Sequence, residues 1–341
     1  MPNVRDNKGG NVESVNLLVT TALNEASLKR ITDISSRVKL TDVSELAQDE
    51  KKGDTAAKKQ LDVLLAEAEI IYGFRLPENA ITRAPRLKWF QTMSAGVDRF
   101  LDDKFQRSPV VMTSVSGIHA VPIGEFVLGL MLMFAKQAPL GFQLKQQRQW
   151  KPFLATELHS RTVGIVGLGH IGREVARLAK AFGMRVVATR RSARQSKSAS
   201  YVDQLFAPDR LLQLLSGSDF VVLTLPLTAE TYRIIGEEEL RSMKPTAYLI
   251  NVARGNLIDE EALVQALEEH RIAGAGLDVF ATEPLPADSR LWELPNVIIS
   301  PHVAGGMEDY VERATAVFCE NLSRYLSGRK LINVVDKRRG Y

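Results

Sequence analysis

The stretch that most constrains the fold of this 341-residue chain lies between Thr162 and Gly172, and reads Thr-Val-Gly-Ile-Val-Gly-Leu-Gly-His-Ile-Gly. A short β-branched run breaks into three glycines, and apolar residues then recur at three- and four-residue spacing as far as Phe182. A strand, a glycine turn and a helix in this order are the context that a dinucleotide-binding fingerprint requires. We therefore predict a dinucleotide site here. The alternative is an ordinary glycine-rich turn between a strand and a helix.

The three glycines have different predicted roles. Gly167 makes the tight turn, Gly169 lets the backbone approach a pyrophosphate, and Gly172 lets the helix pack closely on the strand. The helix N-terminus at His170 and Ile171 offers unpaired N–H groups and a positive dipole end to the phosphates. Because His170 lies inside the turn, its backbone rather than its imidazole is expected to meet the phosphates.

The composition excludes several classes of protein. Hydrophobic residues make up 45% of the chain, and the formal net charge of +4 is too small to indicate a nucleic-acid partner. The one cysteine, Cys319, excludes an internal disulfide and fits a reducing compartment. Residues 1–14 lack the apolar core of a secretory signal, and the longest apolar run, 126–135, is about half of a membrane span. We therefore expect a soluble, cytoplasmic protein with no membrane partner. We also expect no bound metal, because no cluster of His, Cys and Asp residues has the spacing of metal ligands.

The alternation of strand and helix patterns predicts an α/β fold. The length predicts two domains, since single hydrophobic cores stop growing at about 250–300 residues. Before the glycine turn, strands are expected at residues 15–21, 69–74, 87–91 and 110–114, with a helical region at 44–68. After it, strands are expected at 185–189, 219–225, 247–252, 273–279 and 297–300, and helices at 209–215 and 259–269. Buried strands alternating with helices describe a doubly wound parallel sheet.

Two further patterns complete the expected organisation. Residues 119–150 predict one long helix that is buried either between domains or in a subunit interface. Residues 306–326 predict an amphipathic helix that returns to the first lobe, and 337–341 predict a disordered basic tail.

The end of the second strand after the glycine turn distinguishes NAD from NADP. A carboxylate there binds the ribose 2′-hydroxyl of NAD, whereas arginine accommodates the 2′-phosphate of NADP. Here the strand ends in Thr189, followed by Arg190, Arg191 and Ser192, and no acidic residue follows before Asp203. Two arginines and a serine hydroxyl suit a phosphate monoester. NADPH is therefore the predicted cofactor, with NAD possible; the alternative is a basic loop without this role.

Three polar residues follow later strands, at the edge where open α/β sheets bind ligands. They are Arg254, Glu283 and His302, each directly or shortly after an expected strand. Each alone has an ordinary interpretation as a surface or capping residue, but their order is informative. A turn of small residues, 92–98, follows a strand of the first lobe. It is either a helix N-terminus or a nest of backbone N–H groups able to hold a substrate carboxylate.

These residues lie in motifs that resemble the D-isomer-specific 2-hydroxyacid dehydrogenase family. The motifs are Asn-Val-Ala-Arg-Gly at Arg254, Leu-Asp-Val-Phe-Ala-Thr-Glu-Pro at Glu283 and Ser-Pro-His-Val-Ala-Gly at His302. With the turn at 94–98 they cover nearly the whole chain in one order. The resemblance implies a two-lobed fold with a Rossmann doubly wound cofactor domain and a flavodoxin-like substrate domain. NADP-preferring glyoxylate/hydroxypyruvate reductases share the basic second-strand end and are the nearest members by pattern.

The resemblance also implies roles for individual residues. The residue matching Arg254 holds the substrate carboxylate and polarises the carbonyl, and the one matching His302 gives its proton to the developing alkoxide. Glu283 contacts this histidine, and a neighbouring anion favours a protonated imidazole. A second carboxylate anchor is implied at the backbone N–H groups of Ala95 and Gly96. The other implied contacts, all to the cofactor, are Thr231, Val252, Ala253 and Asp278.

We expect the first lobe to be discontinuous, comprising residues 1–117 and 301–341. Residues 118–300 form the expected cofactor lobe, with the active site between the lobes and a hinge at each crossing. The family resemblance implies a homodimer through the apolar helix after His119.

The leading function is NADPH-dependent reduction of a small 2-oxo acid to a 2-hydroxy acid. A dinucleotide-sensing binding protein, like the transcriptional corepressors that share this fold, is the alternative from another class. Phosphite as donor is disfavoured, because phosphite-oxidising relatives place a lysine near the turn at 94–96. Formate is disfavoured as the substrate, because formate-oxidising relatives carry glutamine where this chain has Glu283.

Overall fold

The computed structural model describes residues 14–97, 100–194 and 198–341, and its chain divides into two compact units. Unit 1 comprises Met1–Ser116 and Asp309–Tyr341, and unit 2 comprises Gly117–Glu308. The second crossing therefore follows residue 308, whereas the sequence placed it at 300/301. The reason is local, because Val303 and Ala304 donate backbone hydrogen bonds to Asp278 of unit 2.

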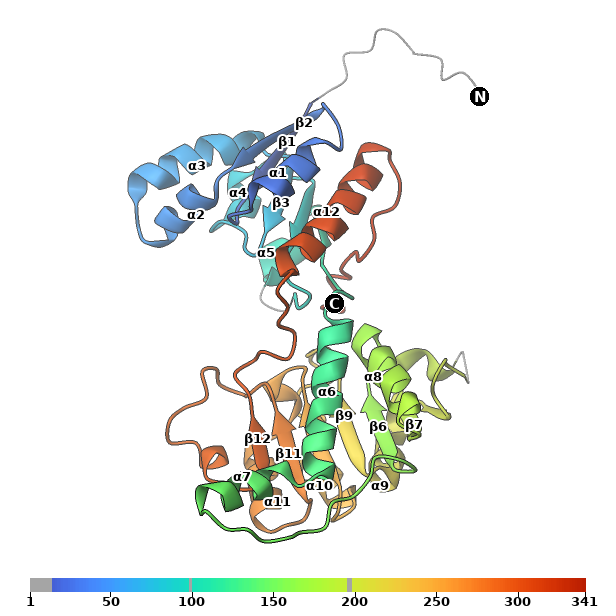
Figure 1. The fold of residues 1–341 in the computed structure, drawn as a ribbon. Coiled ribbons are helices and arrows are strands. Elements are labelled where there is room, and N and C mark those ends of the chain that lie inside the picture. Colours follow the sequence, from blue (N-terminus) through green and yellow to red (C-terminus); the bar gives the residue numbers. More distant parts are fainter. Residues whose placement is uncertain (1–13, 98–99, 195–197) are drawn as a thin grey trace. The chain divides into compact units, whose positions relative to one another are not determined.

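Unit 1 is built on a five-stranded parallel sheet in the order β2-β1-β3-β4-β5, the flavodoxin-like order (Figure 1). Its strands are β1 Val15–Val19, β2 Val38–Asp42, β3 Ile70–Gly73, β4 Trp89–Thr92 and β5 Val111–Thr113. Its helices are α1 Glu25–Thr32, α2 Ser44–Lys51, α3 Thr55–Glu67, α4 Ala80–Arg83, α5 Asp103–Arg107 and α12 Tyr310–Leu326. Strand β2 was not predicted, because its residues are largely exposed and polar. The predicted helical region at 44–68 is two helices, with Gly53 at φ +95° between them.

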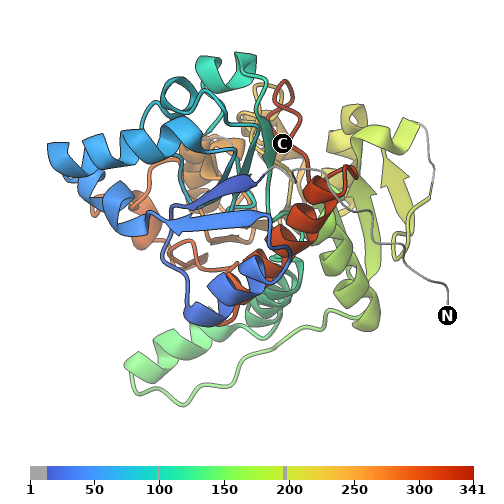
Figure 2. The same cartoon turned by 90° about the horizontal axis from the view of Figure 1, so that it is seen from above.

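The last helix, α12, completes the core of unit 1 and packs beside α1 (Figure 2). Its Phe318 is fully buried and stacks on Tyr72 and Trp89, with ring centroids 4.1 and 5.3 Å apart. The prediction of a disordered tail is wrong. The Val335 N–H donates to the carbonyl of Met112, and the ammonium of Lys337 donates to two carbonyls near the end of α5.

Unit 2 contains a seven-stranded parallel sheet in the order β12-β11-β10-β9-β6-β7-β8. Its strands are β6 Thr162–Val166, β7 Arg185–Thr189, β8 Gln204–Phe206, β9 Phe220–Leu223, β10 Tyr248–Asn251, β11 Gly274–Leu277 and β12 Val297–Ile299. Its helices are α6 Ala120–Ala135, α7 Ala138–Gln146, α8 His170–Ala181, α9 Leu211–Gly217, α10 Glu237–Ser242 and α11 Glu260–Glu268. The strands after β6 are added first on one side of it, as β7 and β8, and then on its other side, from β9 to β12. The crevice at the carboxyl ends of β6 and β9, where this strand order switches, is the expected ligand site of a doubly wound sheet. The predicted fold class is confirmed, and the short strand β8 and the short helix α10 were missed.

The single long helix predicted at 119–150 is wrong. The chain breaks after α6 and bends by 63° into α7. Gln137 at the break has φ +55°, and Pro139 starts the second helix. The apolar face of α6, including fully buried Val127 and Met131, packs in the core that also contains β6 and α8. In the described part of the chain, no single helix is long and apolar enough to span a membrane, and only α6 and α7 taken together reach that length and composition.

Candidate active site

The glycine turn between β6 and α8 has the geometry that a dinucleotide requires. Gly167 has φ +103°, and a Cβ there would lie 2.8 Å from the side chain of Leu225. A Cβ on Gly172 would lie 2.4 Å from the carbonyl oxygen of Gly167. A Cβ on Gly169, by contrast, would meet no described atom within 4 Å. Two glycines therefore allow the turn itself, while the third leaves open space at the N-terminus of α8, where a pyrophosphate fits.

Two threonines that the sequence analysis missed hold this turn in place. The hydroxyl of Thr189 accepts a hydrogen bond from the Gly167 N–H at 3.2 Å, and its carbonyl accepts one from Leu168 at 3.0 Å. The hydroxyl of Thr224 donates to the Gly167 carbonyl at 2.5 Å. Each threonine is the polar residue at the carboxyl end of an apolar strand run. This feature of the sequence could have identified both as residues that hold the turn.

The basic end of β7 fits an anionic ligand. Arg190 is anchored by its N–H, which donates to the Phe206 carbonyl at 3.1 Å. Its side-chain Nε is buried and has no hydrogen-bond partner among the described residues. Leaving a buried cationic donor unpaired is unfavourable, so a phosphate oxygen at this position would satisfy it. Arg191 and Ser192 follow on the exposed surface.

Asp203, the first acidic residue after β7, serves a structural purpose. Its carboxylate accepts hydrogen bonds from the Val186 N–H at 2.7 Å and from Lys180 at 3.0 Å. The Val186 N–H, and then Lys180, lower the pKa of Asp203 below its ordinary value. This carboxylate therefore forms hydrogen bonds to β7 and α8 themselves.

The loops after β9 and β10 hold further predicted cofactor residues. The hydroxyl of Thr231 donates to the Pro226 carbonyl at 2.7 Å and accepts from the Thr228 N–H at 2.8 Å, so it stabilises its own turn. Val252 is buried and Ala253 half-buried directly after β10. They lie at the carboxyl edge of the sheet, as predicted from the strand pattern.

Arg254 is positioned by the residues on either side of it. The buried amide of Asn251 accepts from the Ala253 N–H at 3.1 Å and donates to the Arg254 carbonyl at 2.8 Å. On the other side, a Cβ on Gly255 would lie only 1.9 Å from the carbonyl carbon of Phe280. Glycine is therefore required, because the loop that carries Arg254 runs directly against the loop that follows β11.

Glu283 and His302 form a pair at this edge. His302 Nδ1 lies 2.8 Å from Glu283 Oε2, and Glu283 Oε1 accepts from the Phe280 N–H at 3.1 Å. The side chain of His302 is 51% exposed, so its imidazole is accessible to a ligand. The carboxylate thus orients the imidazole from one side, the arrangement of a general acid–base histidine.

Asp278 holds the loop that carries His302. It is 1% exposed, and its carboxylate accepts from the Ser300 hydroxyl at 2.6 Å and from the N–H groups of Val303 and Ala304 at 2.9 Å each. Its carbonyl accepts from the His302 N–H at 2.9 Å. The family resemblance places this aspartate near the nicotinamide, and the structure shows that both of its carboxylate oxygens bind the histidine loop.

In unit 1, the small-residue turn follows β4. The Ser94 N–H donates to the Thr92 hydroxyl at 3.0 Å. Among the residues described, the N–H groups of Ala95 and Gly96 make no hydrogen bond. Such consecutive N–H groups suit a carboxylate. Asp98, the last residue of this motif, lies outside the described residues.

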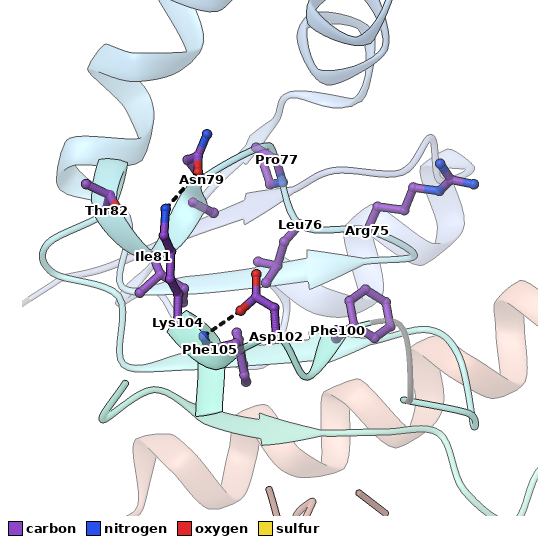
Figure 3. Close-up of a pocket in the computed structure, with 11 residues that line it drawn as sticks. Arg75, Leu76, Pro77, Asn79, Ile81, Thr82, Phe100, Asp102, Lys104 and Phe105 are labelled. Atoms are coloured by element: carbon purple, nitrogen blue, oxygen red, sulfur yellow. Dashed lines mark hydrogen bonds between the residues drawn. The ribbon is translucent and has the colours of Figure 1, made fainter. Parts of the chain in front are cut away.

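Unit 1 contains a cavity of about 390 Å³ between the loop after β3 and α5 (Figure 3). Three of its polar side chains are already engaged with one another or with the backbone: Asp102 accepts from the Phe105 N–H at 2.7 Å, and Lys104 donates to Asn79 at 3.4 Å. Arg75 is exposed at its rim and extends away from both (Figure 3).

The glycine turn, the basic end of β7 and the polar cluster at the same sheet edge define a two-domain, dinucleotide-dependent oxidoreductase. Residues 128–304 match the family model described as "D-isomer specific 2-hydroxyacid dehydrogenase, NAD binding domain". Over 281 residues the chain is 37% identical to the glyoxylate/hydroxypyruvate reductase B of Pectobacterium carotovorum, covering 80% of this chain and 86% of that protein. The chain therefore belongs to the D-isomer specific 2-hydroxyacid dehydrogenase family and is an NAD(P)-dependent oxidoreductase.

Two solved structures are similar over nearly the whole chain. The D-isomer specific 2-hydroxyacid dehydrogenase of Xanthobacter autotrophicus, in complex with NADPH and MES, is 28% identical with a TM-score of 0.82, covering 96% of this chain and 100% of that one. The NADPH-dependent glyoxylate/hydroxypyruvate reductase of Sinorhizobium meliloti, in complex with NADP and sulfate, is 26% identical with a TM-score of 0.81 and the same coverage.

Proposed function

We propose that this protein reduces a small 2-oxo acid to the D-2-hydroxy acid, reversibly and with NADPH as the preferred cofactor. Glyoxylate and hydroxypyruvate are the leading substrates, because the Pectobacterium and Sinorhizobium relatives are named for them. The main structural support is the pair of His302 and Glu283, 2.8 Å apart at the same edge of unit 2 as Arg254. A proton donor and a cation at this edge are what carbonyl reduction in a carboxylic acid requires.

Arg254 is assigned the substrate carboxylate and the carbonyl oxygen. A guanidinium presents parallel N–H donors that match two oxygens at once. As negative charge develops on the carbonyl oxygen, these donors stabilise it more than they stabilise the ground state. The close contact of Gly255 with Phe280 keeps the Arg254 loop in place during this step.

His302 is assigned the proton transfer. A bound nicotinamide cofactor supplies the hydride. The imidazole Nε2 gives a proton to the developing alkoxide while Nδ1 stays paired with Glu283, and in the oxidation direction the same nitrogen takes the proton back. The N–H groups of Ala95 and Gly96 are assigned the second contact to the substrate carboxylate.

Turnover of a panel of 2-oxo acids, graded by side-chain size and assayed with NADPH, tests this function. Robust turnover of glyoxylate or hydroxypyruvate would support it and would exclude a purely dinucleotide-sensing protein. Tight NADPH binding without turnover of any panel member would instead favour the sensing role.

The cofactor preference leads to a prediction for Arg190. Arg190→Ala is expected to lower kcat/KM for NADPH by about 10- to 100-fold, because a hydrogen bond to a charged group contributes about 1.5–3 kcal/mol. With NADH the change should stay within about twofold, since no 2′-phosphate is present to lose its partner. Arg185→Ala is the matched control, because Arg185 starts the same strand and its guanidinium binds Gln204. Equal use of NADH and NADPH by the wild-type protein would contradict the assignment.

The homodimer is also proposed, through the surface formed by α6, α7 and the loop after them. This surface exposes large apolar side chains, with Trp150 99%, Leu154 91% and Phe142 58% exposed. Exposed apolar patches are typical of protein–protein interfaces. Leu154→Asp is expected to shift the protein from dimer to monomer in sedimentation velocity at micromolar concentration. Val63→Asp, at an exposed position on α3, should leave the dimer intact. A wild-type protein that sediments only as a monomer would refute this proposal.

A further inference from the structure

Tyr310, the first residue of α12, contacts two loops of unit 1 that lie far from it in the sequence. Its hydroxyl donates a hydrogen bond to the carbonyl of Met93, which stands 217 positions earlier in the chain. Its ring stacks on Phe74, with centroids 5.6 Å apart and the planes inclined by 27°. Met93 directly follows β4 and Phe74 directly follows β3, which are neighbouring parallel strands. Tyr310 thus lies where the loop carrying Ala95 begins.

The hydrogen bonds of Met93 and Ser94 fix the peptide unit between them at both ends. The Met93 carbonyl accepts from Tyr310, and the Ser94 N–H donates to the Thr92 hydroxyl at 3.0 Å. Because a peptide unit is planar, holding its C=O and its N–H sets the orientation of the whole plane. The next two N–H groups, those of Ala95 and Gly96, extend from this fixed plane through the φ and ψ angles of Ser94 and Ala95, so a shift of the plane would move both of them.

The ring of Tyr310 is itself held by a rigid neighbour. The Phe74 N–H donates to the Thr21 hydroxyl at 2.9 Å. Just before it, a Cβ on Gly73 would lie 2.1 Å from the Thr20 hydroxyl, so the backbone there is tightly enclosed. Stacking on Phe74 therefore directs the Tyr310 hydroxyl at Met93.

We propose that Tyr310 is a positioning residue, whose hydroxyl aligns the Ala95 and Gly96 N–H groups to receive the carboxylate of a 2-oxo acid. Tyr310 acts through the backbone and takes no part in proton transfer. The inference rests on the proposed function, since it assigns a further residue to substrate binding in that reaction.

The test compares Tyr310→Phe with Tyr325→Phe in the full-length protein. Tyr325 lies on the same helix and also donates a hydrogen bond within unit 1, to Glu69 at 2.7 Å, so it controls for a purely structural loss. Tyr310→Phe keeps the ring and is expected to raise KM for the 2-oxo acid about 3- to 10-fold, the effect of one neutral hydrogen bond, with kcat within about twofold. The Kd for NADPH should not change. Tyr325→Phe should leave KM at the wild-type value.

Calorimetric titration with oxalate, a small dicarboxylate, gives a second readout that does not need turnover. A Kd for oxalate that rises in Tyr310→Phe and not in Tyr325→Phe supports the inference. Equal KM and equal oxalate affinity in the two variants would overturn it. A wild-type protein that binds oxalate but reduces no 2-oxo acid would refute the proposed function and leave the oxalate comparison to decide the role of Tyr310.

Discussion

Replacing His302 with asparagine is expected to lower kcat/KM for 2-oxo acid reduction by about 10²- to 10⁴-fold, the usual contribution of a positioned general acid. Asparagine is the suitable replacement because His302 has φ +54°, and asparagine tolerates this left-handed conformation better than alanine does. The loop should therefore keep its fold, since Asp278 still binds the backbone around it. Steady-state kinetics with NADPH and a thermal unfolding curve measure the two properties separately.

His270→Asn is the control for this experiment. His270 also has a positive φ, +53°, but is exposed at the end of α11, so the His270→Asn variant should retain wild-type kinetics.

Arg254→Ala is expected to reduce kcat/KM by at least about 10²-fold, as loss of one donor to a developing oxyanion does. Near-wild-type activity of both His302→Asn and Arg254→Ala on every reduced 2-oxo acid would show that the catalytic assignment is wrong.

Gly255→Ala is expected to reduce activity strongly although Gly255 carries no chemistry. The added Cβ would lie 1.9 Å from the carbonyl carbon of Phe280 and 2.1 Å from its oxygen, so one of the two loops must move. Movement of the Phe280 loop displaces Glu283, because the Phe280 N–H binds its carboxylate. We expect a loss of about 1–3 kcal/mol in the free energy of unfolding, typical of overpacking. A fall of at least about 10²-fold in kcat/KM should accompany it, since both loops carry residues that we assign to catalysis.

Urea unfolding and kinetics of Gly217→Ala provide the comparison. Gly217 ends α9, and a Cβ there would meet no described atom within 4 Å. This variant should keep wild-type kinetics and full stability, because alanine is favoured over glycine in a helix by about 0.5–1 kcal/mol. If Gly255→Ala behaves in the same way, the loop contact does not hold the site.

The sequence predicted the strands with continuous apolar runs and missed those without them. Strands β6 and β9 are buried along their whole length and β10 is buried in all but its first residue, and their β-branched or apolar runs mark them clearly. Strand β2 lies at the sheet edge with alternating polar residues, and β8 has only three residues. Edge strands need little apolar surface, so a hydrophobic pattern detects them poorly.

The sequence also failed where one local residue changes the course of the backbone. The apolar pattern of α6 continues into α7, and periodicity alone therefore joined them into a single helix. The left-handed conformation of Gln137 and the proline two residues later end the first helix and start the second. A Pro at the first turn of a helix is a start signal that the sequence did contain.

By itself, the sequence determined the family, the sheet edge to which the chemistry is assigned, and the order Arg254, Glu283, His302. It can do so because parallel strands bring their carboxyl ends to one edge, whatever the details of packing. The tertiary structure alone decided which contacts hold the site residues of each unit. They are Gly255 against Phe280 and Asp278 on the histidine loop in unit 2, and Tyr310 on Met93 in unit 1. These contacts join residues distant in the chain, and their strength depends on packing distances that a local sequence pattern does not contain.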